Sequence, residues 1–266
     1  MTQEKAMYNT ILYSVQDGAA QLTLNRPDVF NSFNEELSAE VMDALKKSAK
    51  DEAVRVLVIT GTGKAFCSGQ DLKDIKNQTG ARSLGESVVR RYNPMITAIR
   101  EMAKPVICKL NGVAAGAGAS LALACDMIVA SETASLIEVF INVGLVPDSG
   151  SSFFLPHLVG YNKAFELCTL ASKITAKEAH ALGFIYKIVP PEELDSATLA
   201  LAQHYAAGPT KSYGLIKKML NKAYTAGLQD MLQYEAYNQE IAGKSEDYKE
   251  GVNSFVEKRK PVFKGK

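Results

Sequence analysis

The sequence contains few of the residues that bind metal ions or build disulfide frameworks, and it lacks a long apolar run. Its three histidines lie far apart in the chain, which does not suggest a metal site, although separation in sequence alone does not exclude one. Its four cysteines stand mostly in apolar stretches, so we expect reduced core thiols of a cytosolic protein. No apolar run approaches the length that spans a bilayer, so we expect no membrane insertion.

An excess of charge of either sign is also missing. The chain has 30 basic and 29 acidic residues and a net charge of +1, which gives no reason to expect a nucleic-acid partner. Its first residues, Met1–Lys5, are polar and lead into a strand-like pattern, without the apolar segment of a signal peptide. A cytoplasmic protein is the resulting expectation.

The sequence does contain enough apolar residues for a large core. Hydrophobic residues make up 47% of the 266 positions, which suits one large domain or two small ones. Up to residue 190, strand–loop–helix units recur, with apolar strands that suit a sheet covered on both faces, so we expect an α/β fold. The turn signal Asp17-Gly18 predicts a hairpin between strands over 10–15 and 20–24. Further predictions are a helix from Asn34 to about Lys50, a strand over Val56–Thr60, a charged segment over Lys73–Glu86, a helix near Ser87–Met102 and a strand beginning at Pro105.

The pattern changes to helices alone after Pro190. We therefore divide the chain into an α/β body over 1–190 and a helical region over 191–266, either a small second domain or an oligomer interface. Four helices are predicted, over Glu192–Ala207, Pro209–Ala226, Leu228–Ala242 and Ser245–Glu257. Apolar residues in this region favour self-association: Leu215, Ile216, Met219, Leu220, Leu228, Met231 and Leu232.

Two glycine-containing loops each follow an apolar strand. The loop Lys64–Leu72 follows Val56–Ile59, and the loop Asn111–Ser120 leads from Pro105–Leu110 into the apolar helix Leu121–Ala124. Small residues at the start of a helix leave backbone N–H groups exposed, and the helix dipole stabilises negative charge beside them. Two such loops can direct one N–H each at a single oxygen, which makes an oxyanion hole. The alternative is two tight turns that need small residues.

Several motifs resemble the crotonase (enoyl-CoA hydratase/isomerase) superfamily in order and spacing. They are Leu24–Pro27, Ala65–Leu72, Asn111-Gly112 with its glycine loop, and Cys125-Asp126. The resemblance implies a spiral of ββα units with C-terminal helices that build trimers or pairs of trimers. It implies an acyl-CoA thioester as substrate, with the thioester oxygen held by the N–H groups of Gln70 and Ala117 and with no metal or redox cofactor. Residues implied to bind the CoA ester are Val29, Phe30, Ala65, Ser68, Gln70, Asp71, Leu72 and Gly116.

The acidic residues distinguish two activities within that family. Hydratases carry two glutamates where this chain has Ser120 and Phe140, and neither of these side chains activates water at neutral pH. Isomerases often carry an acid at the position of Asp148, so the resemblance implies that Asp148 moves protons. The same residue, standing between a proline and an apolar helix, also fits a helix N-cap. Glu138 is a rival base, because alternation along a strand Leu136–Phe140 would place it on the face of Phe140; the alternative is a solvated or salt-bridged residue.

The family resemblance and the single acid together predict an acyl-CoA isomerase. Within the family, the loops at 112–120 and 144–148 and the segment Ala242–Val252 are most similar to members that act on ring-epoxidised phenylacetyl-CoA in phenylacetate breakdown. The alternatives are a straight-chain Δ3,Δ2-enoyl-CoA isomerase of fatty acid metabolism, a hydratase, and a homologue that binds acyl-CoA or RNA without catalysis. Lys258–Lys260 is interpreted as a solvated surface run, or as a contact from a neighbouring subunit to the CoA phosphate.

Overall fold

The computed structural model describes residues 8–73 and 83–266, and it contains a six-stranded and a four-stranded sheet. The predicted segments Met1–Lys5 and most of Lys73–Glu86 lie outside the described residues. The larger sheet has the order β1-β2-β3-β5-β7-β10, and the smaller one has the order β4-β6-β8-β9. The strands are β1 Ile11–Gln16, β2 Ala19–Leu24, β3 Val56–Gly61, β4 Ala65–Cys67, β5 Val106–Leu110, β6 Val113–Ala115, β7 Met127–Ser131, β8 Ser135–Ile137, β9 Ile174–Thr175 and β10 Lys187–Val189.

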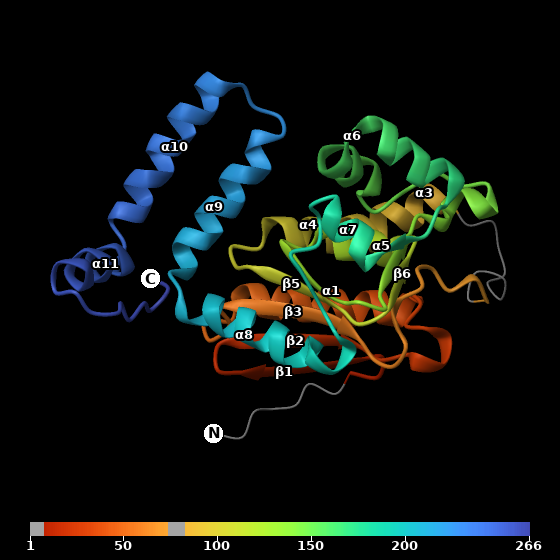
Figure 1. The fold of residues 1–266 in the computed structure, drawn as a ribbon, viewed down its shortest axis with the longest axis horizontal. Helices are drawn as coiled ribbons and strands as arrows, with labels where there is room; N and C mark the ends of the chain where they lie inside the picture. Colours follow the sequence, from red (N-terminus) through yellow and green to blue (C-terminus); the bar gives the residue numbers. More distant parts are fainter. Residues whose placement is uncertain (1–7, 74–82) are drawn as a thin grey trace.

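Helices cover the larger sheet and make up most of the C-terminal part of the chain (Figure 1). The α-helices are α1 Glu35–Lys50, α3 Leu84–Ser87, α4 Asn93–Glu101, α5 Ala117–Ala124, α6 Ser151–Leu170, α7 Ala176–Ala181, α8 Leu194–Ala207, α9 Thr210–Ala223, α10 Leu228–Gly243 and α11 Glu246–Val256. Short 3-10 segments are η1 Pro27–Val29, η3 Val139–Val143 and η4 Pro191–Glu193, and η2 Val88–Tyr92 is a π-helical turn between α3 and α4. No helix in the described ranges is both long and apolar enough to cross a membrane.

The N-terminal predictions are confirmed. Asp17 (φ 49°) and Gly18 (φ 80°) turn the β1–β2 hairpin, as a type I′ turn requires. The side chain of Asn34 accepts a hydrogen bond from the backbone N–H of Leu37 at 2.9 Å, so it caps α1 at the predicted position.

The larger sheet is covered on both faces, as its apolar strands predicted. Val56 and Val58 of β3 belong to a cluster with α8, whereas Leu57 and Ile59 belong to the main core with α1. Alternate residues of one strand therefore pack on opposite helical layers. The short helix α5 is buried over its whole length, because its side chains are apolar apart from Ser120.

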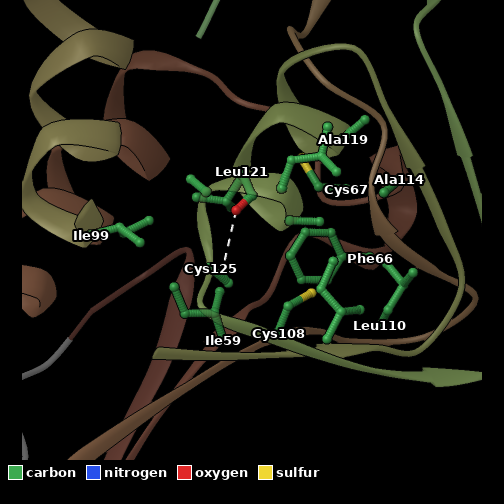
Figure 2. Packing of buried hydrophobic residues seen from close by; sticks show 14 of the residues in the cluster. Ile59, Phe66, Cys67, Ile99, Cys108, Leu110, Ala114, Ala119, Leu121 and Cys125 are labelled. Atoms are coloured by element: carbon green, nitrogen blue, oxygen red, sulfur yellow. Dashed lines mark hydrogen bonds between the residues drawn. The ribbon is translucent and has the colours of Figure 1, made fainter. Parts of the chain in front are cut away.

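All four cysteines are free thiols; three of them are buried in this core, and Cys168 is partly buried and packs against it. Figure 2 shows Cys67, Cys108 and Cys125 among apolar side chains such as Phe66, and the Cys125 thiol donates to the carbonyl of Leu121 at 3.4 Å. Burial raises the pKa of the Cys67 thiol to about 12, which keeps it protonated and unreactive at neutral pH.

The four predicted C-terminal helices are confirmed as α8 to α11, but they pack in two different ways. Helix α8 lies on the larger sheet, whereas α9 and α10 form an antiparallel hairpin that extends from the body (Figure 1). Lys217 of α9 anchors the hairpin, since its ammonium donates to Asp126 at 2.7 Å and to the carbonyl of Ile99 at 2.7 Å. The part of the helical region that extends from the body thus begins at α9, and the division of the chain at residue 190 stays a prediction.

Candidate active site

Glycines allow the two predicted loops to approach each other at backbone distance. A Cβ atom added to Gly69 would lie 2.8 Å from the carbonyl oxygen of Ala115 and 3.4 Å from the nitrogen of Ala117. A Cβ atom added to Gly118 would lie 2.2 Å from the carbonyl oxygen of Cys67. Such distances exclude any larger residue without backbone movement, so these positions require glycine because of the close approach. Part of the first loop, Ala65–Cys67, is strand β4 rather than loop.

Backbone N–H groups from both loops are left unpaired beside this contact. Phe33 donates to the carbonyl of Gly69 at 2.7 Å and accepts from the N–H of Asp71 at 2.9 Å. In this parallel bridge the N–H of Gln70 points away from Phe33. Ala117 is the first residue of α5, so its N–H has no partner within the helix. Among the described residues neither N–H donates to a protein acceptor, which leaves two donors of the kind that hold an oxyanion.

A mainly apolar cavity of about 450 Å³ opens at these donors. It brings together six of the predicted site residues: Ser68, Gln70, Leu72, Gly116, Ala117 and Asp148. The apolar part of its lining is Leu72, Leu84, Val88, Val139, Phe140, Val143, Leu145 and Val146. A concave apolar site with a few convergent polar groups is the usual form of a small-molecule site.

The other four residues predicted to bind CoA lie outside the lining of this cavity. Val29 and Phe30 belong to the turn at η1, and Phe30 is 57% exposed. Ala65 is buried in β4. Asp71 is buried and pairs with Arg26 at 3.1 Å. A contact of these four residues with CoA therefore stays a prediction.

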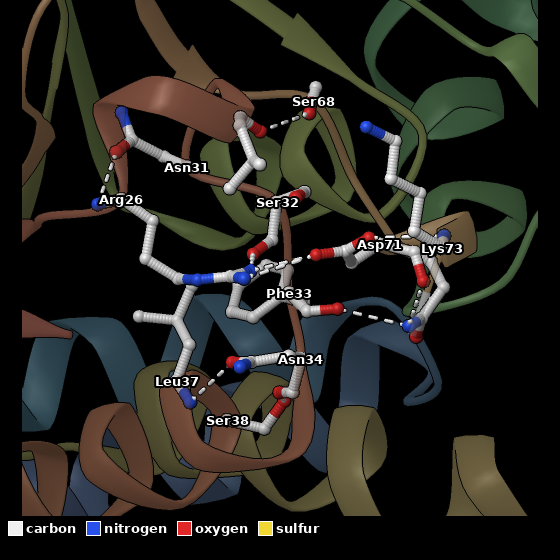
Figure 3. A network of polar contacts seen from close by, with 12 residues as sticks. Arg26, Asn31, Ser32, Phe33, Asn34, Leu37, Ser38, Ser68, Asp71 and Lys73 are labelled. Atoms are coloured by element: carbon white, nitrogen blue, oxygen red, sulfur yellow. Dashed lines mark hydrogen bonds and ion pairs between the residues drawn. The ribbon is translucent and has the colours of Figure 1, made fainter. Parts of the chain in front are cut away.

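A polar network holds the first loop against the turn at η1 (Figure 3). Besides pairing with Asp71, Arg26 donates to the carbonyl of Ser32 at 2.6 Å. The Asn31 side chain is fully buried, accepts from the N–H of Arg26 at 2.9 Å and donates to the carbonyl of Ala65 at 2.9 Å. The role of Asp71 visible in the structure is thus to fix the loop that carries Gln70.

Asp148 does not cap a helix, which corrects the alternative interpretation of this residue. Helix α6 begins at Ser151 with Gly150 as its N-cap, and no side chain caps it. Ser149 (φ 53°) and Gly150 (φ 88°) form a tight turn closed by the N–H of Ser151, which donates to the carbonyl of Asp148 at 3.1 Å. The turn places the half-buried Asp148 carboxyl in the cavity wall. Burial raises its pKa, opposed by the Ser149 hydroxyl at 2.7 Å.

The segment after β8 is not the predicted strand. Strand β8 ends at Ile137, and residues Val139–Val143 form a 3-10 helix. Phe140 nevertheless lies in the cavity wall, at one of the two positions where hydratases carry glutamate. Ser120 is fully buried beneath the cavity wall and is not part of its lining. Among the described residues, Asp148 is thus the only carboxyl group in the lining.

Glu138 is neither solvated nor salt-bridged, which corrects a second expectation. It is 5% exposed, and its Oε1 accepts from the Ser151 hydroxyl at 2.9 Å. Its Oε2 has no hydrogen-bond partner among the described residues. Desolvation by burial, together with the nearby charge of Asp148, raises the pKa of Glu138 to about 7, against the effect of the Ser151 hydrogen bond.

This shift predicts a pH-dependent contribution to stability. The pKa of Glu138 is raised from 4.5 to about 7 in the folded protein. Protonated Glu138 therefore contributes its whole stabilising effect below pH 4.5, and this contribution is lost as pH rises through about 7. The loss amounts to about 3 kcal/mol of unfolding free energy. Urea unfolding at pH 5 and pH 8 measures this loss. The difference in unfolding free energy between Glu138→Gln and the unaltered protein should shift in favour of the variant by about this amount from pH 5 to pH 8. An equal difference at both pH values would contradict the shift.

Tyr92 is a site residue that sequence analysis missed. Its hydroxyl donates to Oε1 of Gln70, its ring packs edge-on against Phe33 with centroids 5.7 Å apart, and it lines the cavity. The Gln70 amide also donates to the carbonyl of Phe33 at 2.9 Å, so both ends of this side chain are held. Tyr92 ends the π-helical turn η2, a feature frequent at functional sites. No local pattern marks it, since its partners lie 22 and 59 positions away.

The remaining candidate groups are possible metal ligands and a basic surface run. Within the described ranges, no group of three or more His, Cys, Asp or Glu residues is arranged to hold a metal ion. At the surface, Arg259 pairs with Glu250 and Glu257, both at 2.5 Å, beside the exposed Lys258 and Lys260. A phosphate contact from this run stays a prediction.

Comparison with known proteins identifies the family. The family described as enoyl-CoA hydratase/isomerase matches residues 14–266. The chain is 44% identical over 262 residues to the 1,2-epoxyphenylacetyl-CoA isomerase of Escherichia coli (strain K12), covering 98% of this chain and 100% of that protein. It is 41% identical over 261 residues to a Rhodobacter capsulatus protein named "Probable enoyl-CoA hydratase", with coverage of 97% and 99%. An enoyl-CoA hydratase crystal structure from Bacillus anthracis matches with a TM-score of 0.92 at 30% identity, covering 97% of this chain and 100% of that one. The protein belongs to the enoyl-CoA hydratase/isomerase family and has the crotonase fold.

Proposed function

We propose that the protein is an acyl-CoA isomerase that uses Asp148 as its single acid–base group. One observation carries this proposal: Asp148 is the only carboxyl group among the described residues that line the cavity, which also contains two unpaired backbone N–H groups. Hydration needs a group that activates water and a group that returns a proton. Moving one proton within a substrate needs a single carboxylate that accepts it and gives it back.

The proposed reaction follows from the positions of these groups. The thioester oxygen accepts hydrogen bonds from the N–H groups of Gln70 and Ala117, which stabilise the enolate as its charge develops. Asp148 removes a proton from the carbon next to the thioester and returns it to another carbon of the acyl chain, so that the double bond moves and no atom is gained or lost. Its raised pKa brings the carboxyl closer to neutral pH, which suits a group that must both accept and donate.

The acyl group we propose is ring-epoxidised phenylacetyl. The carbon–carbon bond shared by the epoxide and the six-membered ring breaks to give the seven-membered oxepin. The proton that Asp148 removes next to the thioester returns to a ring carbon, so that the double bonds shift and no atom is gained or lost. Support comes from the similarity to the E. coli 1,2-epoxyphenylacetyl-CoA isomerase and from the apolar cavity wall, in which Phe140 occupies space that hydratases give to a glutamate. Exclusion of water from such a cavity protects a reactive ring during rearrangement. The straight-chain Δ3,Δ2-enoyl-CoA isomerase uses the same groups and is the main alternative.

A panel of three substrates tests this assignment. We expect kcat/KM to be highest for ring-epoxidised phenylacetyl-CoA generated by its oxygenase, lower for 3-hexenoyl-CoA, and at background for hydration of crotonyl-CoA. Products are identified by mass spectrometry and absorbance. Turnover of 3-hexenoyl-CoA alone would replace the ring substrate with straight-chain enoyl-CoA. Efficient hydration of crotonyl-CoA would contradict the isomerase assignment, and no turnover of any ester would favour a non-catalytic binding protein.

The proposed enzyme is a homo-oligomer, a trimer or a pair of trimers, held together by its C-terminal helices. Large apolar side chains are exposed on these helices, among them Leu220 at 64%, Leu228 at 71% and Phe255 at 85%. Light scattering at micromolar concentration is expected to give three or six times the mass of one chain. A stable monomer would contradict the prediction. Replacing Leu220 and Leu228 with glutamine should shift the mass toward one chain while retaining helical circular dichroism.

A further inference from the structure

A chain of buried hydroxyl groups connects Glu138 to the turn that carries Asp148. The Ser151 hydroxyl lies 2.9 Å from Oε1 of Glu138 and 2.7 Å from the Ser120 hydroxyl. The Ser120 hydroxyl lies 3.1 Å from the carbonyl oxygen of Asp148 and 3.2 Å from that of Gly116. Because Ser120 stands one turn after Ala117 on α5, the chain links the Asp148 turn to the helix that supplies an oxyanion donor.

The number of protons in this chain sets its direction, because each serine hydroxyl has one hydrogen to donate. When Glu138 is ionised, Ser151 donates to Glu138. The 2.7 Å contact between the two serines then uses the hydrogen of Ser120, so Ser120 no longer donates a hydrogen bond to the carbonyl of Asp148. When Glu138 carries a proton, it donates to Ser151, Ser151 donates to Ser120, and Ser120 donates to the carbonyls of Asp148 and Gly116.

We propose that Glu138 is a positioning residue whose proton directs the Ser151–Ser120 chain toward Asp148 and so holds the proton-transferring carboxyl in place in the cavity that contains the oxyanion donors. This inference rests on the function proposed above. Glu138 does not touch the substrate, since it is buried outside the lining of the cavity. It acts by fixing the backbone of Asp148 to α5, and a small displacement of a reacting group has a large effect on rate.

The surroundings of Glu138 favour its protonated form. Its carboxyl faces apolar side chains of α5, β8 and α6, such as Leu123, Leu136 and Leu155. The ionisable groups near it are Asp148, whose negative charge opposes ionisation of Glu138, and the Cys168 thiol of α6. A raised pKa of about 7 for Glu138 agrees with this setting. The chain therefore reverses near neutral pH, and we expect kcat to fall as pH rises through about 7.

Two substitutions test the proposal through the pH profile of kcat. Glu138→Gln supplies an amide donor to Ser151 at every pH, so kcat should resemble that of the unaltered enzyme at pH 6 and the decline above pH 7 should vanish. Ser120→Ala removes the last link and should lower kcat roughly tenfold or more at pH 6, with KM little changed and no further decline near pH 7. Glu192→Gln, an exposed carboxyl on η4, serves as the matched control and should keep the native profile.

An infrared titration supplies a readout that does not depend on turnover. The protonated-carboxyl band of the unaltered protein should disappear around pH 7, be absent in Glu138→Gln and persist in Asp148→Asn. The proposal would be overturned if kcat of Glu138→Gln still declined with the same midpoint near pH 7. It would also be overturned if the unaltered protein showed no protonated Glu138 band at pH 6. These outcomes are distinct from failure of the proposed function, in which Asp148→Asn itself would retain full turnover.

Discussion

Replacing Asp148 with asparagine is expected to lower kcat for isomerisation about a hundredfold or more and to leave binding of CoA esters largely unchanged. Asparagine keeps the size of the side chain and an oxygen that accepts from the Ser149 hydroxyl, now 2.7 Å from the carboxylate. It does not accept a proton at neutral pH. Since Asp148 caps no helix, the substitution removes chemistry rather than a structural hydrogen bond.

The experiment measures single-turnover rates with the best substrate of the panel, together with calorimetric binding of a non-reactive CoA thioester. Asp17→Asn is a matched control, because Asp17 is exposed in the β1–β2 turn and asparagine suits its positive φ. Turnover by Asp148→Asn within a fewfold of the native rate would remove Asp148 from the mechanism. A loss of binding as large as the loss of rate would show that the variant damages the cavity.

Replacing Ala117 with proline is expected to reduce kcat by about a hundredfold to a thousandfold, the usual effect of losing one oxyanion donor. Proline has no N–H, and its ring carbon occupies the direction in which the N–H of Ala117 points. Position 117 is the first residue of α5, where helices tolerate proline. Gly116, with φ 51° and ψ −125°, precedes it without a side chain to clash.

The control for this substitution is Ala117→Gly, which keeps the N–H and removes a single buried methyl group. Circular dichroism and thermal unfolding check that both variants fold. We expect Ala117→Gly to retain most of its activity while Ala117→Pro loses it. Equal activity in the two folded variants would mean that the N–H of Ala117 holds no developing charge and that the glycine loop is only a tight turn.

Much of the framework around the site could be predicted from sequence because its signals are local. The Asp17-Gly18 turn, the Asn34 cap of α1 and the four C-terminal helices depend on residues a few positions apart, and the structure confirms them. The two glycine loops were likewise identified by their composition, and the family resemblance assigned their N–H groups to one site.

Local signals failed where distant contacts decide the structure. Alternation predicted a strand through Phe140, but β8 pairs only as far as Ile137, and the chain then turns into a 3-10 helix that packs against α6. Proline before Asp148 suggested a cap, yet Ser149 and Gly150 adopt positive φ and the helix starts later. Tyr92 of η2 binds Gln70 through a hydrogen bond between residues 22 positions apart, which no local pattern indicates.

The sequence by itself determined the β1–β2 hairpin, the start of α1, the four C-terminal helices, the two glycine loops and the presence of an acid at position 148. Only the tertiary structure decided which of these groups share one cavity. The lining of that cavity does not include Val29, Phe30, Ala65 or Asp71. It also showed that Glu138, expected to be either a rival base or a solvated or salt-bridged residue, is a buried carboxyl linked through Ser151 and Ser120 to the backbone carbonyl of Asp148. The physical reason is that hydrophobic periodicity and turn preference act over a few residues, whereas burial, pKa and hydrogen-bond partners depend on segments that meet only after folding.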